Sequence, residues 1–426
     1  MHRDPDVEAI LLLNVPFGQG SAEFRPLTPG QYREFAQWLY TRTLSPADLL
    51  GDERDRILSD WDHNVVLENA RIKKPTREHI EHLLGRGFEM GLIMGDWESA
   101  GLWALTRADQ DYPRHLRRRL GRNSPPVLFG CGEKGWLSQP TVAVVGSRDA
   151  RPEDLEFCRN FGAHVSREGA VLVSGAAKGV DRKAMSGAIK AGGFAVGVMA
   201  EGLLRKSSSP KDRLWIQEGH LTLVSQFPPE ARWRGHQAMI RNKLIYCLSD
   251  AALVVASADG SKLSKGKSGT WTGATENIRN KWVPLWVKRS HDDKSGNAAL
   301  VRKGGQWLPE PFPALNELMA LQTQGRPQEQ FAVPFDEQYA PPEKVIDEKS
   351  TRAAHRLLPI LKGEMSRKEI REAIELKSWS GINRRYVAPC LEQGWIEMTN
   401  PDVPRSPKQR FRLTQSGEKW LISKGM

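Results

Sequence analysis

The sequence predicts an α/β protein built around a Rossmann-like, doubly wound and mostly parallel sheet. Two observations predict this class. Short apolar, β-branched runs recur along the middle of the chain, and helical patterns separate them. Apolar runs without alternation are typical of strands covered on both faces, and alternating strands and helices are typical of an open doubly wound sheet. A helical N-terminal domain and a C-terminal winged helix-turn-helix domain are expected to flank the sheet.

The chain of 426 residues divides into four predicted segments. We expect a helical domain over residues 1–125, a Rossmann domain over 126–318, a linker over 319–350 and a winged-helix domain over 351–426. The linker is predicted because this stretch is rich in Pro, Gln and acidic residues and lacks periodicity.

Two helices are predicted in the N-terminal segment. Thr28 and Pro29 match an N-cap followed by proline at the first helical position. A second helix is expected from Thr76 to a stop near Gly85. The tryptophans of this segment are interpreted as core residues rather than as platforms for nucleic-acid bases.

Six strands are predicted in the central segment, several of them followed by glycine or basic residues. In open α/β sheets, ligands bind at the carboxyl ends of the strands. The residues that follow these strands are therefore the candidate site. The predicted strands are Thr141–Val145, Ala170–Val173, Phe194–Val198, Leu221–Val224, Ala252–Val255 and Trp282–Val287.

The candidate pocket is made of glycines, hydroxyl side chains and cations. Glycine permits close approach of a ligand to the backbone, and Arg and Lys supply charge for phosphate. Asp181 is interpreted as a helix cap, and a solvated loop is the alternative for the lysines before Ser268. No GxGxxG follows a strand, so no nicotinamide cofactor is expected, and neither is a metal. The candidates are Gly146, Ser147, Arg148, Gly175, Lys178, Gly179, Arg241, Asn242, Lys243, Lys267, Ser268, Gly269 and Thr270.

Taken in chain order, these motifs resemble the DprA/Smf (DNA-processing protein A) family. The segment Asp111-Tyr112-Pro113 is followed by VVGSRDA, SGAAKGVD, IRNKLI and SGTW, so that the resemblance covers roughly residues 109–307. It implies a Rossmann-like domain that dimerises, binds single-stranded DNA in a basic pocket and helps to load a recombinase. It also implies that the chain contacts DNA through Arg148, Lys178, Arg241, Asn242 and Lys243, with Gly146, Gly175 and Gly179 shaping the pocket floor.

The chain departs from the usual family pattern at several positions. Lys178 stands where the family usually has Arg, which keeps the charge but loses the bidentate fork. Further departures are Met185 in place of His, Gln226 in place of Glu, Ala238-Met239 in place of Phe-Pro, and Ala256 in place of Glu.

The C-terminal segment carries much of the excess positive charge. The formal net charge of the chain is +11, and residues 351–426 hold 15 Lys and Arg against 8 Asp and Glu, a net +7. Ser366 and Glu369 form a predicted capping box. The helix expected over 381–393 would enter the major groove of DNA, and protein docking is the alternative. The candidate contacts are Asn383, Arg384, Arg385, Tyr386, Arg405, Lys408, Arg410 and Arg412.

The sequence thus predicts a DNA-binding protein of DNA processing or recombination, and not an enzyme. Expected partners are single-stranded DNA, double-stranded DNA through the winged helix, a second copy of the chain, and a recombinase or toxin. Two alternatives stay open. One is a regulator in antiviral defence, antitoxin-like or DNA-sensing, and the other is a nucleotide sensor or hydrolase with Glu276 as the acidic candidate. Widely spaced cysteines and the lack of a signal peptide or membrane span predict a cytoplasmic location.

Overall fold

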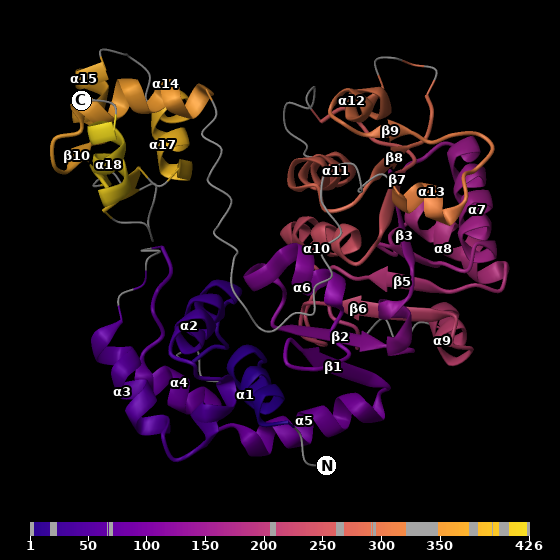
Figure 1. The fold of residues 1–426 in the computed structure, drawn as a ribbon, viewed down its shortest axis with the longest axis horizontal. Coiled ribbons are helices and arrows are strands. Elements are labelled where there is room, and N and C mark those ends of the chain that lie inside the picture. Colours follow the sequence, from indigo (N-terminus) through magenta and orange to yellow (C-terminus); the bar gives the residue numbers. More distant parts are fainter. Residues whose placement is uncertain are drawn as a thin grey trace. The chain divides into compact units, whose positions relative to one another are not determined.

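Figure 1 shows the fold in a computed structural model of the chain. Contacts group the residues into two compact units, Met1–Gln330 and Phe331–Met426, which are described separately. The structure describes residues 4–17, 24–65, 67, 71–204, 210–260, 268–290, 292, 295–320, 348–374, 382–393, 395–399 and 409–423.

The first unit contains one sheet, to which the described residues contribute nine strands in the order β1-β2-β6-β5-β4-β3-β7-β8-β9. The strands from β6 to β9 are mutually parallel, whereas β2 is antiparallel to both β1 and β6. The strand bounds are β1 Leu102–Thr106, β2 Val127–Cys131, β3 Thr141–Val145, β4 Val171–Ser174, β5 Ala195–Val198, β6 Leu221–Ser225, β7 Ala251–Val254, β8 Leu285–Val287 and β9 Gln306–Trp307.

Helices cover both faces of this sheet, which confirms the predicted doubly wound class (Figure 1). Helices α7 and α8 pack on one face, and α6, α10 and α11 pack on the other. The strands β2 to β8 are buried along their whole length because they lie between these two layers. The bounds are α6 Arg114–Leu120, α7 Pro152–Arg167, α8 Val180–Lys190, α9 Pro210–Gln217, α10 Gly235–Cys247, α11 Gly269–Asn280, α12 Gly296–Arg302 and α13 Leu315–Ala320, with short 3-10 turns η2 Gly121–Asn123 and η3 Lys134–Ser138.

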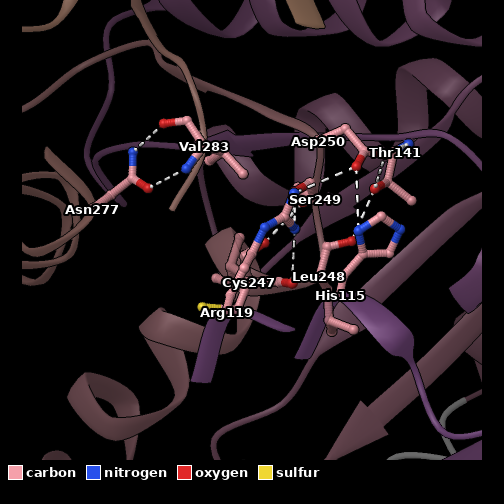
Figure 2. Close-up of polar contacts among 10 residues, drawn as sticks. His115, Arg119, Thr141, Cys247, Leu248, Ser249, Asp250, Asn277 and Val283 are labelled. Atoms are coloured by element: carbon pink, nitrogen blue, oxygen red, sulfur yellow. Dashed lines mark hydrogen bonds and ion pairs between the residues drawn. The ribbon is translucent and has the colours of Figure 1, made fainter. Parts of the chain in front are cut away.

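All six strands predicted from the sequence are present. Only β8 is clearly shorter than expected, since it begins at Leu285 rather than at Trp282. The cause is Asn277, whose side chain donates to the carbonyl of Val283 (3.0 Å) and accepts from its amide (3.1 Å), as Figure 2 shows. These two bonds hold Val283 in a turn and keep it out of the sheet ladder.

The N-terminal part is helical and shares its core with the α7–α8 face of the sheet. Both predicted helix starts are confirmed: Thr28 caps α2 in a capping box with Gln31, and Thr76 caps α4. The strand β1, which pairs with β2, was not predicted in this part. The helix bounds are α1 Pro5–Asn14, α2 Pro29–Thr41, η1 Pro46–Leu50, α3 Arg54–Asn64, α4 Arg77–Leu84 and α5 Gly87–Ser99.

The second unit consists of short helices around a small sheet in the order β10-β12-β11. The predicted capping box is present, since Glu369 Oε2 accepts from the amide of Ser366 (2.6 Å) and Ser366 Oγ accepts from the amide of Glu369 (3.3 Å). The bounds are α14 Glu348–Leu357, η5 Leu358–Ile360, β10 Met365–Ser366, α15 Arg367–Ile374, the π-helical turn η6 Asn383–Val387, α17 Ala388–Gln393, β11 Ile396–Met398, β12 Arg410–Leu413 and α18 Gln415–Ser423.

The four cysteines are buried free thiols. Burial raises the pKa of each thiol, to about 11 for Cys131 and about 12 for Cys158, Cys247 and Cys390. Throughout the described ranges, no helix is both long and apolar enough to cross a membrane. In the same residues, no three His, Cys, Asp or Glu side chains gather into a potential metal site.

Candidate functional site

A pocket of about 470 Å³ lies at the carboxyl edge of the sheet. Its wall is formed by the loop after β3, the loop between β4 and α8, helix α10 and the N-terminus of α11. This is the edge at which open α/β sheets bind their ligands. The lining residues are Val145, Gly146, Ser147, Arg148, Ala177, Asp181, Trp233, Gly235, Ala238, Met239, Arg241, Asn242, Ile245, Tyr246, Ser268, Gly269 and Thr270.

The pocket brings together most of the pocket residues that were predicted from the sequence. Three separate clusters meet in it, although they are as far apart in the chain as Gly146 and Thr270. The nominated residues that line it are Gly146, Ser147, Arg148, Arg241, Asn242, Ser268, Gly269 and Thr270.

Four other nominated residues do not line the pocket. Lys178 is exposed on the loop before α8, and Lys243 is half-buried on α10, one residue beyond Asn242. Gly179 has a φ of +87°, and a Cβ there would lie 2.5 Å from the carbonyl oxygen of Arg148, so this glycine shapes the loop. Gly175 lies beneath the pocket against Arg241. Lys267 falls outside the described residues.

Arg241 and Asp181 form the floor of the pocket, and each is only 6% exposed. The backbone amides of Gly146, Gly175 and Ala177 lie near the Asp181 carboxylate and act to lower its pKa. Gly179, not Asp181, is the N-cap of α8, so the predicted capping role of Asp181 is wrong. Asp181 lies inside the helix, with its carboxylate near the loops that follow β3 and β4.

The charge on this floor is imperfectly compensated. Burial raises the pKa of Asp181 to about 6, although Arg241 acts to lower it. Burial also lowers the pKa of Arg241, and Arg148 acts in the same direction. Arg241 Nε has no hydrogen-bond partner in the described part of the chain, and neither has the hydroxyl of Tyr246. A buried donor without an acceptor costs about 1–3 kcal/mol, so the protein itself compensates this guanidinium only in part.

The opposite wall is the N-terminus of α11. Ser268 is the N-cap and accepts from the amide of Trp271 (3.3 Å). Asn242 donates from Nδ2 to the carbonyl of Gly269 (3.0 Å), which ties α11 to α10. The first-turn amides of a helix lack intrahelical acceptors and carry partial positive charge, so they favour an anionic ligand.

At the rim, Ser147 and Arg148 have different roles. The amide of Ser147 donates to the carbonyl of Ala256 (2.9 Å), and its hydroxyl accepts from the amide of Asp149 (3.1 Å). Ser147 therefore holds its own turn in place. Arg148 is exposed and has no ion pair within the described residues, so its guanidinium is free to bind phosphate.

Trp233 is a lining residue that the sequence analysis missed. It is 52% exposed, which is unusual for tryptophan, and it stands between two exposed arginines, Arg232 and Arg234. The segment precedes α10 and has no strand or helix periodicity. An aromatic residue interleaved with basic ones was the available signal.

The pocket should respond to pH through Asp181. Because the pKa of Asp181 is higher in the folded protein than its ordinary value of 3.8, the contribution of Asp181 to the free energy of unfolding is largest below about pH 4 and is lost as pH rises through 6. Ionised Asp181 offsets the charge of Arg241. We therefore predict that affinity for a short oligonucleotide increases several-fold from pH 7.5 to 5.5.

Asp181→Asn separates this effect from the titration of other groups, such as the exposed His236. The variant should lose most of the pH dependence, and thermal unfolding would show whether it keeps its fold. An unchanged pH profile in a folded Asp181→Asn protein would assign the dependence elsewhere.

In the second unit, several of the residues predicted to contact DNA are half-buried or ion-paired. Asn383 and Arg385 are exposed, whereas Tyr386 is half-buried and packs against the core. Arg410 pairs with Glu369 (3.1 Å), and Arg412 pairs with Glu397 (2.6 Å) and Glu364 (3.2 Å). The side chain of Arg384, together with Arg405 and Lys408, lies outside what the structure describes.

The fold and the pocket define a Rossmann-like α/β protein whose pocket at the carboxyl edge of the sheet is lined by arginine side chains and by the N-terminus of a helix. Residues 103–319 match the model of the family described as DNA recombination-mediator protein A. This match covers half of the chain, so the protein belongs to that family, which confirms the DprA/Smf resemblance. Residues 353–414 match the C-terminal domain of the family described as filamentation induced by cAMP protein Fic-like.

Curated relatives agree with this assignment. The chain is 28% identical to DNA processing protein DprA of Bacillus subtilis over 167 residues, which are 38% of this chain and 55% of the relative. It is 27% identical to Protein Smf of Escherichia coli over 289 residues, which are 66% of this chain and 74% of that protein. The match therefore spans about half of the first relative and three quarters of the second.

The fold is similar to that of DNA processing protein A from Streptococcus pneumoniae. The TM-score is 0.50 at 21% identity, over 66% of this chain and 90% of that chain. The similarity supports the assigned fold.

Proposed function

We propose that the first unit binds single-stranded DNA by holding a backbone phosphate in the pocket. The observation that carries this proposal is the buried Arg241, whose Nε lacks a partner among the described residues while its guanidinium faces the pocket. Arg148 at the rim and the N-terminus of α11 supply further positive potential on the same space. A phosphodiester fits this arrangement because it is an anion with several acceptor oxygens.

The direct test is a binding assay on the full chain with an oligothymidylate of about 20 nucleotides and a duplex of equal length, each over a range of salt concentrations. We expect binding of the single strand with an affinity that falls as salt rises. Retained affinity for the single strand in a variant that lacks both Arg148 and Arg241 would refute the pocket.

We propose that Trp233 stacks on a base of the bound strand. Base–aromatic stacking is worth about 1–3 kcal/mol per base, so Trp233→Ala should weaken binding of an oligothymidylate by about tenfold. The salt dependence should stay the same because no charge is removed. Trp233→Phe, which keeps an aromatic face, is the matched control.

An abasic oligonucleotide of the same length completes this test. It retains the phosphates but offers no base, so wild type and Trp233→Ala should bind it equally. An equal loss of affinity for both oligonucleotides would mean that Trp233 supports the pocket and does not stack.

We propose binding rather than catalysis. Asp181 is the lining carboxylate, and three nearby backbone amides and Arg241 stabilise its charge. Glu276, the acidic candidate from the sequence, is not a lining residue and lies near Tyr246 and Cys247. Incubation with nucleoside mono- and triphosphates, followed by chromatography, should yield no product.

For the second unit we propose a winged helix that binds double-stranded DNA. The order of helices and the sheet β10-β12-β11 support this, as do the exposed Asn383 and Arg385 at the helix that would enter the groove. Arg410 and Arg412 fit it less well, since both are ion-paired within the unit. Arg385→Ala should weaken duplex binding while leaving binding of a short single strand unchanged.

We also propose, on the family resemblance alone, that the protein acts as a homodimer in the cytoplasm. A recombinase partner follows the same resemblance, and the toxin partner of a defence system is the alternative. Light scattering on the full chain tests the dimer, and pull-down with purified recombinase tests the partner.

A further inference from the structure

We propose that a second surface on the first unit, formed by Arg114, Arg117, Arg118 and Arg122, binds the sugar–phosphate chain of the strand after it leaves the pocket. This set is called the α6 arginine surface. The proposal rests on the proposed single-strand binding, and it extends the contact from one phosphate to a path across the protein.

The first observation is the exposure of these cations, of which Arg117 has the Asp109 carboxylate nearby. All four are exposed, and no Asp or Glu occurs between Tyr112 and Gly132. Arg114, Arg118 and Arg122 have no ion pair within the described residues. Arg117 donates to the carbonyls of Arg107 (2.6 Å) and Asp109 (2.8 Å), which are uncharged acceptors. A run of like charges on the short helix α6 and the η2 turn that follows it is unfavourable unless an anion binds there.

The second observation is that the opposite side of α6 is firmly attached (Figure 2). Arg119 donates to the carbonyls of Cys247 (2.9 Å) and Ser249, and lies 3.5 Å from Asp250. His115 Nδ1 lies 3.4 Å from the same carboxylate, which also accepts from the amide of Thr141 (3.0 Å). This carboxylate is thus occupied by groups on the buried side, and the exposed arginines project from a fixed support.

The third observation is continuity with the pocket. Helix α10 carries Arg241 in the pocket and ends at Cys247, where Arg119 of α6 binds. Arg241 and Cys247 are six positions apart on this helix, which is about 9 Å along the axis. Lys243, nominated from the sequence but absent from the pocket lining, lies between them, and α6 packs beside α10 (Figure 1). Sites for single strands typically cover about 4–16 nucleotides, so one strand can reach both places.

The test compares oligothymidylates of about 6 and about 20 nucleotides on the full-length protein. The variant replaces Arg114, Arg118 and Arg122 by alanine. The matched control replaces three exposed arginines on other helices, Arg167, Arg213 and Arg279, also by alanine. Thermal unfolding verifies that both variants remain folded.

We expect wild type to bind the longer oligonucleotide at least tenfold more tightly than the shorter one. The α6 variant should lose this gain and bind the shorter one within twofold of wild type, while the control variant keeps the gain. The salt slope of the α6 variant with the longer oligonucleotide should fall by about 2, at roughly 0.7 for each phosphate that is no longer neutralised.

Unchanged affinity of the α6 variant for the longer oligonucleotide, or equal affinity of wild type for both lengths, would overturn the α6 arginine surface. Failure of the proposed function is a separate result: Arg148→Ala would then leave binding of the shorter oligonucleotide unaffected.

Discussion

Arg148→Ala is expected to weaken binding of single-stranded DNA by the full chain by about tenfold or more. A hydrogen bond to a charged group contributes about 1.5–3 kcal/mol, and 1.4 kcal/mol corresponds to a factor of ten. Arg148 is exposed at the pocket rim and has no ion pair in the described residues, so its removal should leave the free energy of unfolding nearly unchanged. The weaker affinity would therefore report on the interaction with the ligand alone.

The salt dependence gives this prediction a second readout. For single strands, the slope of log affinity against log salt should decrease by about 0.7, because one phosphate is no longer neutralised. Arg279→Ala is the matched control, because Arg279 is an exposed arginine near the far end of α11. If Arg148→Ala and Arg279→Ala had the same small effect, the pocket would not be the phosphate site.

The sequence predicted the centre of the fold well because the parallel strands are apolar throughout. Thr141–Val145 has no polar side chain that alternates with apolar ones, as expected for β3 between two helical layers. The edge elements were missed for the opposite reason. β1 resembles many half-buried runs, and β9 has only two residues, Gln306 and Trp307, so local patterns carry little information about their pairing.

Sequence patterns predicted the site residues that directly follow strand ends. They missed the contacts that depend on how helices and loops pack together. The chain runs directly from the end of β3 into Gly146, Ser147 and Arg148. The position of this strand therefore fixes the three residues at the edge of the pocket. Lys178 was predicted by the same logic, yet it is exposed and does not line the pocket. The contact between Asp181 and Arg241 depends on how α10 lies over the β4–α8 loop, which no local pattern encodes.

Gly175→Ala is expected to weaken ligand binding in the pocket by displacing the side chain of Arg241. A Cβ at this position would lie 1.6 Å from Arg241 Nη1 and 2.6 Å from Asp181 Oδ2, so the guanidinium must move. Overpacking of this kind typically costs about 1–3 kcal/mol of stability. Binding of single-stranded DNA should fall by about tenfold or more because Arg241 no longer faces the pocket. Gly95→Ala on α5 is the control, since nothing lies within 4 Å of a Cβ there and alanine favours a helix.

A double-mutant cycle on the binding free energy shows whether this effect acts through Arg241. If Gly175→Ala weakens binding only by displacing that guanidinium, the change should have no further effect in an Arg241→Ala background. The two losses would then be strongly non-additive, with a coupling of the same size as either single effect. Additive losses would mean that Gly175 acts independently of Arg241. Since Gly175→Ala costs stability, the cycle is measured well below the unfolding temperature of every variant, where each remains folded.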